Sequence, residues 1–294
     1  MKKFVQKILD KLNLPEERRE KINLFLQTVS YYKLLPYIDF IKDNQNIASE
    51  INRLINGKDS WDAVVCLYRY NIKLSMAIYP YIYLLETTIK TQVNNLLSES
   101  FGFDWYKNPS VLHRANKNSI NYLEENANSY LNEVSIPNLM DFVENNTTLG
   151  YWIALIGSGN FWNSNDIKLR SLFSANKTIN TATLQLKEIN KKLRSVNDLR
   201  NSIAHYNQII GCKIDRKGYS DYKLWNVYQN ILKLLCLLGC KDIDWMIGDL
   251  HCKPKEYCKG NSFETLYKDF ECVHQYKIKP EKAVRATKLD NIEL

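Results

Sequence analysis

The stretch NDLRNSIAHYNQ, residues 197–208, brings an arginine, an amide and a histidine close together along the chain. These are Arg200, Asn201 and His205, and His205 is one of only four histidines in the sequence. A guanidinium suits a phosphate because it donates two parallel hydrogen bonds to it. An imidazole accepts and donates protons near neutral pH, and an amide can orient a hydroxyl or the imidazole. This set of side chains is suited to cleaving RNA without a metal ion.

In such a reaction the 2′-hydroxyl of the RNA is the nucleophile, so the protein moves protons and neutralises the crowded phosphorane. We therefore take Arg200, Asn201 and His205 as candidate catalytic residues. A structural alternative stays open. Arg200 would then form an ion pair with Asp198, Glu188 or Glu86, and the chain would be a helical protein-interaction domain.

The long segment that leads into this stretch has the apolar spacing of a helix. We predict a helix from Thr183, with one apolar face formed by Leu186, Ile189, Leu193, Val196 and Ile203. Arg200 lies at or beside the seam of this face. If the helix continues through the stretch, Arg200 and His205 project about 140° apart. Two copies in a symmetric homodimer would bring both residue types to one groove.

Helical periodicity dominates the rest of the chain, and its 10 Gly and 7 Pro are few for 294 residues. The sequence predicts an all-α fold, a helical bundle with N- and C-terminal helical additions. The expected divisions are an N-terminal helical extension (1–22), the main helical domain (23–240) and a lysine-rich C-terminal tail (241–294). Pro36 is expected to bend or break its helix, and Ser60–Ser98 reads as two helices or one kinked at Pro80. Gly239 is expected to cap an apolar helix.

Two further residues are candidate RNA contacts. Lys90 lies one helical turn after Glu86, so it either borders an RNA groove or forms a salt bridge with that glutamate. Tyr206, next to His205, is a candidate for stacking on an unpaired base. The chain has 19 tyrosines, and we expect Tyr31, Tyr32, Tyr79 and Tyr83 to lie mostly in the core.

Composition limits the partners and the compartment. The net charge of +8 suits a polyanion without requiring one. Seven scattered cysteines predict reduced thiols, and no leader or membrane-spanning segment is recognised, so we expect a cytoplasmic protein. No glycine-rich nucleotide loop is present, and no cofactor is expected. The C-terminal residues His251, Cys252, Cys258, Cys272 and His274 are zinc-ligand types, but their spacings lack a C-x2–4-C pair, so we predict no metal site.

Several blocks of the chain resemble a known family in their order. RNSIAH fits the R-x4-H signature of HEPN domains. The blocks VSYYKLLPYIDF, LYRYNIKLSMAIYPYIYLLETTIKTQV, FGFDWY, GYWIALI and LRNSIAHYN are similar to successive segments of Abi-like proteins of the AbiD/AbiF type, which act in abortive phage infection. The resemblance runs from about Phe25 to Ile210.

The resemblance implies a HEPN-like fold, a homodimer, and a metal-independent ribonuclease held in check until infection. It also implies an RNA partner, as substrate or as a regulatory antitoxin RNA. Arg200, Asn201 and His205 match the catalytic signature by position. The residues we take as RNA contacts are Lys90, Gln92, Tyr206 and Asn207. The family often has a further arginine where Tyr206, Asn207 and Gln208 stand, so a non-catalytic RNA-binding or scaffold protein of the same fold is the alternative.

Overall fold

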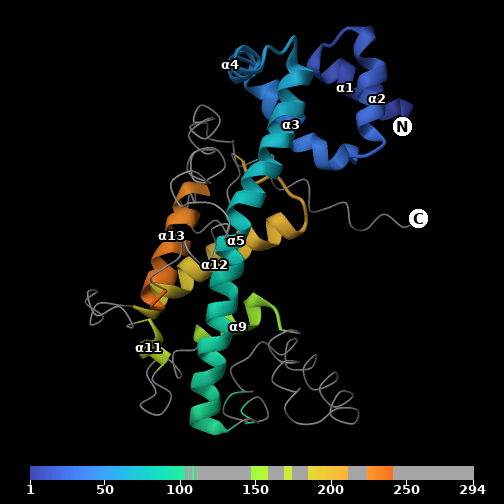
Figure 1. The fold of residues 1–294 in the computed structure, drawn as a ribbon. Helices are drawn as coiled ribbons and strands as arrows, with labels where there is room; N and C mark the ends of the chain where they lie inside the picture. The colour runs from blue at the N-terminus through green and yellow to red at the C-terminus, as the bar shows by residue number, and fades with distance from the viewer. Residues whose placement is uncertain are drawn as a thin grey trace, which may run out of the picture. The chain divides into compact units, whose positions relative to one another are not determined.

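The computed structural model describes residues 1–102, 105, 108, 111, 147–157, 169–173, 185–210 and 224–240 (Figure 1). Over these ranges every extended regular element is a helix, which confirms the predicted all-α class. Contacts within the chain divide it into two units. Of the described residues, unit 1 holds Met1–Ala77, 202–210 and Leu224, and unit 2 holds the remainder. The domain bounds expected from the sequence stay a prediction.

Unit 1 is built from short N-terminal helices and the first part of a long one. These are α1 (Lys2–Leu12), the 3-10 turn η1 (Glu16–Arg18), α2 (Arg19–Leu26), α3 (Tyr31–Asp43), α4 (Gln45–Ile55) and the start of α5 (Ser60–Phe101). Helix α1 packs against α2 and α3, and α3 packs against α4. Each helix buries residues three or four apart, such as Leu34, Ile38 and Ile41 of α3, so one apolar stripe per helix builds the core.

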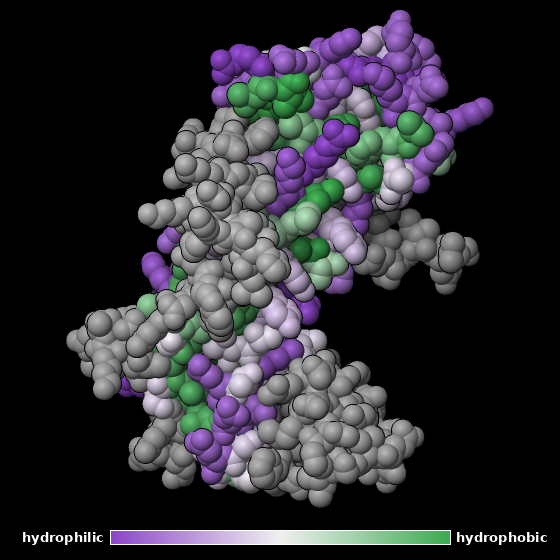
Figure 2. Space-filling model, in the orientation of Figure 1, coloured by the Kyte–Doolittle hydropathy of each residue, from purple (hydrophilic) through white to green (hydrophobic). Residues whose placement is uncertain are grey.

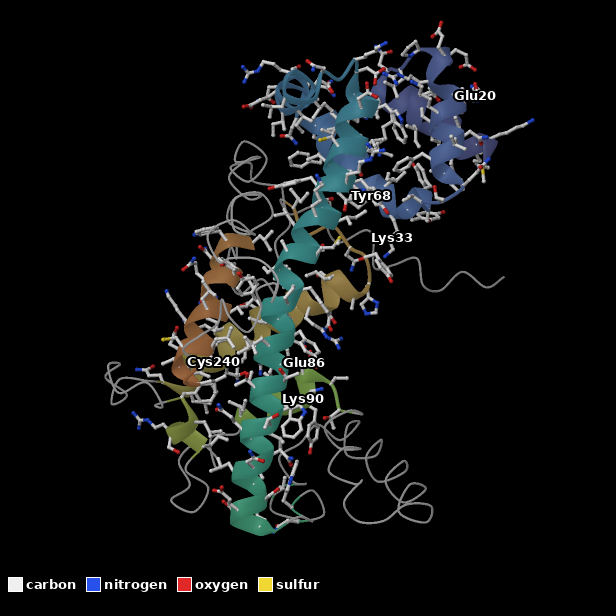
Figure 3. The ribbon with its side chains drawn as sticks, viewed as in Figure 1. Glu20, Lys33, Tyr68, Glu86, Lys90 and Cys240 are labelled. Atoms are coloured by element: carbon white, nitrogen blue, oxygen red, sulfur yellow. The ribbon has the colours of Figure 1, made fainter. Side chains whose placement is uncertain are left out.

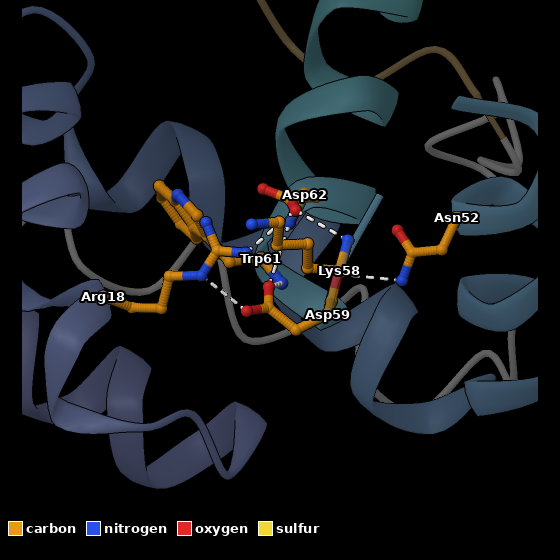
Figure 4. A network of polar contacts seen from close by, with 6 residues as sticks. All are labelled: Arg18, Asn52, Lys58, Asp59, Trp61 and Asp62. Carbon is orange, nitrogen blue, oxygen red and sulfur yellow. Dashed lines mark hydrogen bonds and ion pairs between the residues drawn. The ribbon is translucent and has the colours of Figure 1, made fainter. Parts of the chain in front are cut away.

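A polar network joins η1 to the start of α5 in unit 1 (Figure 4). The guanidinium of Arg18, a largely buried residue, donates to Asp59 through Nε and to Asp62 through Nη2, at 2.5 and 2.9 Å. Asp62 also accepts from the backbone N–H of Lys58, and the Asn52 amide donates to the Asp59 carbonyl. The network pairs a buried cation with two carboxylates, which offsets the loss of its hydration.

This network predicts an acid-sensitive contribution to stability. Burial by itself would raise the pKa of Asp62, but hydrogen bonds from Lys58 N–H and Arg18 outweigh it and hold that pKa below its usual value. The stabilisation is therefore present above the unfolded-state pKa and is lost as pH falls through the folded-state value. We expect Asp62→Asn to lower the free energy of unfolding by about 1–2 kcal/mol near neutral pH and by less near about pH 3. Urea unfolding of both proteins at the two pH values measures this, and an equal loss at both would contradict it.

The two prolines do not end their helices. Helix α3 runs through Pro36 and α5 runs through Pro80, and the chain leaves helical structure before α3, between Leu26 and Tyr31. Of the bend or break expected at Pro36, the break is therefore wrong, and the bend stays a prediction. Each proline leaves the carbonyl four residues earlier without its helical partner, and those residues, Tyr32 and Met76, are exposed. Water can satisfy both carbonyls, so the helices tolerate the prolines.

Among the described residues, unit 2 contains the rest of α5 and four further helices. These are α9 (Leu149–Ile156), α11 (Leu169–Leu172), α12 (Leu186–Ala204, of which unit 2 holds all up to Asn201) and α13 (Leu224–Leu237). Helix α5 buries a regular stripe in this unit, comprising Ile78, Ile82, Leu85, Ile89, Val93 and Leu97. Trp105 and Trp152, both fully buried, have ring centroids 5.9 Å apart, and their indole N–H groups donate to Asn94 and Thr147. The apolar face predicted for α12 is confirmed for Ile189, Leu193 and Val196.

Several tyrosines expected in the core lie at the surface. Tyr32, Tyr79 and Tyr83 are 59%, 43% and 62% exposed, so the core prediction is wrong for these three. Around Tyr79 and Tyr83 the buried face of α5 is formed by Ile78, Ile82 and Leu85. Apolar groups also reach the surface of unit 1, where Figure 2 shows green atoms over α4 and where Leu54 and Ile55 are exposed.

Within the part of the chain that the structure describes, no helix combines the length and the apolar character needed to cross a bilayer.

Candidate nuclease site

Helix α12 ends within the R-x4-H stretch. Its last helical residue is Ala204, and two backbone hydrogen bonds close the end, from Tyr206 N–H to Ile203 O (2.9 Å) and from Asn207 N–H to Ser202 O (2.8 Å). Tyr206 adopts a left-handed backbone conformation, with φ 54°. This is the Schellman pattern of a helix C-terminus. His205 is thus an exposed residue at the helix end, and the angle expected for an uninterrupted helix does not apply.

Two side chains from other helices of unit 1 fix the chain around His205. Lys33 of α3, labelled in Figure 3, donates through Nζ to His205 O (2.7 Å) and to Asn207 Oδ1 (3.0 Å). A cation at the C-terminal end of a helix also interacts favourably with the helix dipole. Buried Asn71 of α5 accepts from Ile209 N–H (2.8 Å) and donates to Asn207 O (3.4 Å). The backbone that carries the histidine is therefore held on both sides.

We expect Asn71→Ala to loosen this segment. The substitution leaves the buried Ile209 N–H without its acceptor, which costs about 1–3 kcal/mol. The free energy of unfolding should fall by that amount, and the Ile209 amide should exchange with solvent faster. Lys73→Ala, at an exposed position of the same helix, is the matched control and should change neither quantity. Unchanged exchange at Ile209 in Asn71→Ala would show that Asn71 does not hold the segment.

Arg200 lies in unit 2 and is paired with a carboxylate. Its Nε is 3.5 Å from Oε2 of Glu86, and the other oxygen of Glu86 is 3.1 Å from Nζ of Lys90 (Figure 3). The Nη1 of Arg200 donates to Asn201 Oδ1 at 3.4 Å. The predicted ion pair between Arg200 and Glu86 is thus confirmed, as is the salt bridge between Glu86 and Lys90. Leu199 is buried and continues the apolar face of α12, and Arg200 lies beside this face.

The Glu86 cluster, defined as Glu86, Lys90 and Arg200, joins two cations to one carboxylate. The Nε of Arg200 is buried and lies at ion-pair distance from Glu86 without a hydrogen bond to it, while 30% of the arginine side chain stays exposed. A guanidinium has five N–H donors, and the described hydrogen bond of Arg200 to Asn201 uses one of them, so donor capacity remains for an anion. Arg200 therefore has the donors to bind a phosphate.

The structure distributes the predicted site residues over both units. Arg200 and Asn201 belong to unit 2 with Glu86, and His205 belongs to unit 1 with Lys33. The catalytic assignment of Arg200, Asn201 and His205 stays a prediction.

The four predicted RNA contacts differ in their surroundings. Lys90 is ion-paired, the amide of Gln92 donates to Leu238 O (2.9 Å), and the side chain of Asn207 accepts from Lys33. Tyr206 is 82% exposed, so its ring is available to a ligand. Gln208 belongs to the segment 206–208, where the family often has an arginine. It is buried, and its side-chain amide donates to Ile210 O.

Lys33 and Asn71 are the residues that sequence reasoning missed. Both lie more than a hundred positions from His205, and no spacing rule links them to it. Asn71 gave a faint signal, as an amide between Leu67 and Leu74 on the apolar face of α5, because buried amides usually bind backbone groups.

The described ranges contain no group of three or more His, Cys, Asp or Glu side chains arranged to hold a metal ion. The C-terminal histidines and cysteines weighed as zinc ligands lie outside the described residues.

Comparison with known proteins gives one match. Neither the curated proteins nor the solved structures contain a match to this chain. The family described as Abi-like protein matches residues 24–211, which is more than half of the 294 residues and includes the blocks that carry the sequence resemblance. The R-x4-H stretch and the Glu86 cluster both fall within the match. The chain therefore belongs to the Abi-like family of abortive-infection proteins.

Proposed function

We propose that this protein is a metal-independent endoribonuclease that acts in the cytoplasm as an effector of abortive infection, with a HEPN-type fold. The observation that carries the proposal is the R-x4-H set itself, in which Arg200 is partly exposed and keeps N–H donors for an anion, and His205 is exposed on a fixed helix end. Family membership supports a role in phage defence.

The proposed reaction is attack of the RNA 2′-oxygen on the adjacent phosphorus, with loss of the 5′-oxygen of the next nucleotide. The 2′-hydroxyl gives its proton to a base, the P–O5′ bond breaks, and the departing 5′-oxygen gains a proton. The products are a 2′,3′-cyclic phosphate and a 5′-hydroxyl. His205 transfers protons, Arg200 neutralises the charge on the phosphorane, and Asn201 orients Arg200 or the attacking hydroxyl.

Cleavage of labelled RNA by the purified protein, with and without EDTA, tests the proposal. We expect equal rates in both conditions and products that end in a 2′,3′-cyclic phosphate. Loss of cleavage in EDTA, or products with 3′-hydroxyl ends, would point to metal-dependent hydrolysis and contradict the proposed chemistry.

We further propose that the site is shared across a homodimer, so that arginines and histidines of both copies line one groove. Coexpressed Arg200→Ala and His205→Ala chains would then form mixed dimers that retain one arginine and one histidine in the groove. We expect such a mixture to regain measurable cleavage, while each variant purified separately stays inactive. Absence of cleavage in a mixture shown by mass to contain mixed dimers would contradict a shared site.

A second candidate function is RNA binding without cleavage, as a scaffold or as the target of an antitoxin RNA. The ion pair of Arg200 with Glu86 favours it, as do the structural bonds of Asn207 and Gln208 where an arginine is common in the family. Tight, salt-sensitive RNA binding with no cleavage at high protein concentration would support this function. The cleavage assay above therefore separates the two candidates.

A further inference from the structure

Tyr206 differs in residue type from the other described residues that have a left-handed backbone conformation. Among the described residues, positive φ occurs at Asn13, Asn56, Gly102, Gly239 and Tyr206. Glycine and asparagine are the residues that tolerate this conformation, because other side chains crowd the following carbonyl. Four of the five positions therefore carry the expected residue types, and Tyr206 is the exception.

The end of α13 shows the same backbone pattern with the expected residue. There Gly239 N–H donates to Cys236 O and Cys240 N–H donates to Leu235 O, and Gly239 has φ 83°. The end of α12 has equivalent hydrogen bonds with Tyr206 at the glycine position. The end of α13 shows that glycine is sufficient to form this type of helix cap. The tyrosine side chain at position 206 is therefore not needed to form the cap at the end of α12. Strain of this type persists at functional sites.

Burial does not account for the tyrosine either. Tyr206 is 82% exposed, the largest value among the large apolar residues that the structure describes. The backbone under the ring is held by the bonds of Lys33 to His205 O and Asn207 Oδ1, and by the bond of Asn71 to Asn207 O. A strained, exposed aromatic ring on a fixed backbone is a preorganised surface for stacking.

We propose that Tyr206 stacks on an unpaired RNA base next to the phosphate that His205 acts on, which makes single-stranded RNA the substrate class. The inference rests on the proposed function, because it uses the position of His205. Stacking on an aromatic ring needs a base free of its own stack, so a duplex cannot use this contact. Every base has a flat face, so the contact selects strandedness and not sequence.

The test compares Tyr206→Gly and Tyr206→Phe in the His205→Ala protein, which keeps the RNA intact. The probe is a short labelled single-stranded RNA of mixed sequence, with the duplex of the same sequence beside it. We expect Tyr206→Gly to weaken single-strand binding about 5- to 100-fold and to leave the salt dependence unchanged, since no phosphate contact is lost. Tyr206→Phe should bind within about twofold of the parent, and duplex binding should not change.

The thermal stability of Tyr206→Gly is expected to change in the opposite direction to its affinity for RNA. Tyr206→Gly relieves the left-handed strain, so we expect its thermal unfolding midpoint to rise by about 2–4 °C while binding weakens. A residue needed for the fold would lower the midpoint. Asn56→Gly, at another left-handed helix end of unit 1, is the control and should not change RNA binding.

Three results would overturn the inference. If the His205→Ala protein binds RNA and Tyr206→Gly binds it equally well, Tyr206 is not a stacking residue, and the ribonuclease proposal is untouched. If Tyr206→Gly lowers the unfolding midpoint or converts a dimer to a monomer, the ring serves the fold or a protein contact. If the parent neither binds nor cleaves RNA, the proposed function fails, and this inference fails with it.

Discussion

Replacing His205 or Arg200 by alanine is expected to slow RNA cleavage by about a hundredfold to ten-thousandfold, because proton transfer and charge neutralisation each contribute on the order of 10² to 10⁴. Single-turnover cleavage of labelled RNA by the purified variants measures the loss. The two effects should not add in the double variant, since the two side chains act on one phosphate.

Both variants are expected to fold. His205 is exposed, and its contact with Lys33 is made by its backbone carbonyl, which alanine retains. Removing Arg200 leaves Glu86 paired with Lys90. Arg194→Ala, at an exposed position of α12, is the matched control and should cleave RNA at the normal rate. Wild-type rates in both His205→Ala and Arg200→Ala would remove these residues from the mechanism.

Glu86→Gln is expected to separate binding from catalysis. The substitution removes the negative charge between Lys90 and Arg200, so we expect RNA to bind more tightly and the salt dependence of binding to steepen by about one released ion. Cleavage should slow by about tenfold or more, because Arg200 loses its ion pair with Glu86 and the guanidinium is less well positioned. Binding measured at two salt concentrations, together with single-turnover rates, tests both parts.

The same substitution should lower the free energy of unfolding by about 1–2 kcal/mol, since two partly buried cations lose their carboxylate. Glu188→Gln, whose partner Lys192 lies on the same helix and is more exposed, controls for the loss of a charge and should change none of these quantities. Faster cleavage by Glu86→Gln would instead show that Glu86 restrains Arg200 in the resting protein.

Helix faces and one helix end could be predicted from the sequence. Leu193 and Val196 are buried because apolar residues at intervals of three and four make one helical stripe, and that pattern is local. Gly239 caps α13 because glycine tolerates the left-handed conformation that ends a helix. Both signals lie within a few residues of the feature that they predict.

The end of α12 could not be predicted in this way, because the left-handed position holds a tyrosine and no glycine or asparagine marks it. The exposure of Tyr79 and Tyr83 is also a tertiary property, since it depends on which face of α5 the other helices of unit 2 cover. A single helix with apolar groups on several faces does not specify that choice.

The polar contacts around the candidate site join residues far apart in the chain. The sequence left Asp198, Glu188 and Glu86 open as partners of Arg200, and the packing of α5 beside α12 within unit 2 selects Glu86. Lys33 and Asn71 meet the chain after α12 through side-chain bonds to backbone atoms, which carry no residue-type signal at the accepting end. Composition and periodicity do not encode such contacts.

Attack by the 2′-hydroxyl at the R-x4-H site is tested with an RNA that has one mapped cleavage position and the same RNA with a single 2′-deoxynucleotide at that position, both in EDTA. We expect the wild-type protein to cut the first RNA, to leave a 2′,3′-cyclic phosphate, and not to cut the second RNA at that position. We expect His205→Ala to cut neither RNA. Cleavage of the deoxy-substituted position, or undiminished cleavage by His205→Ala, would contradict this mechanism.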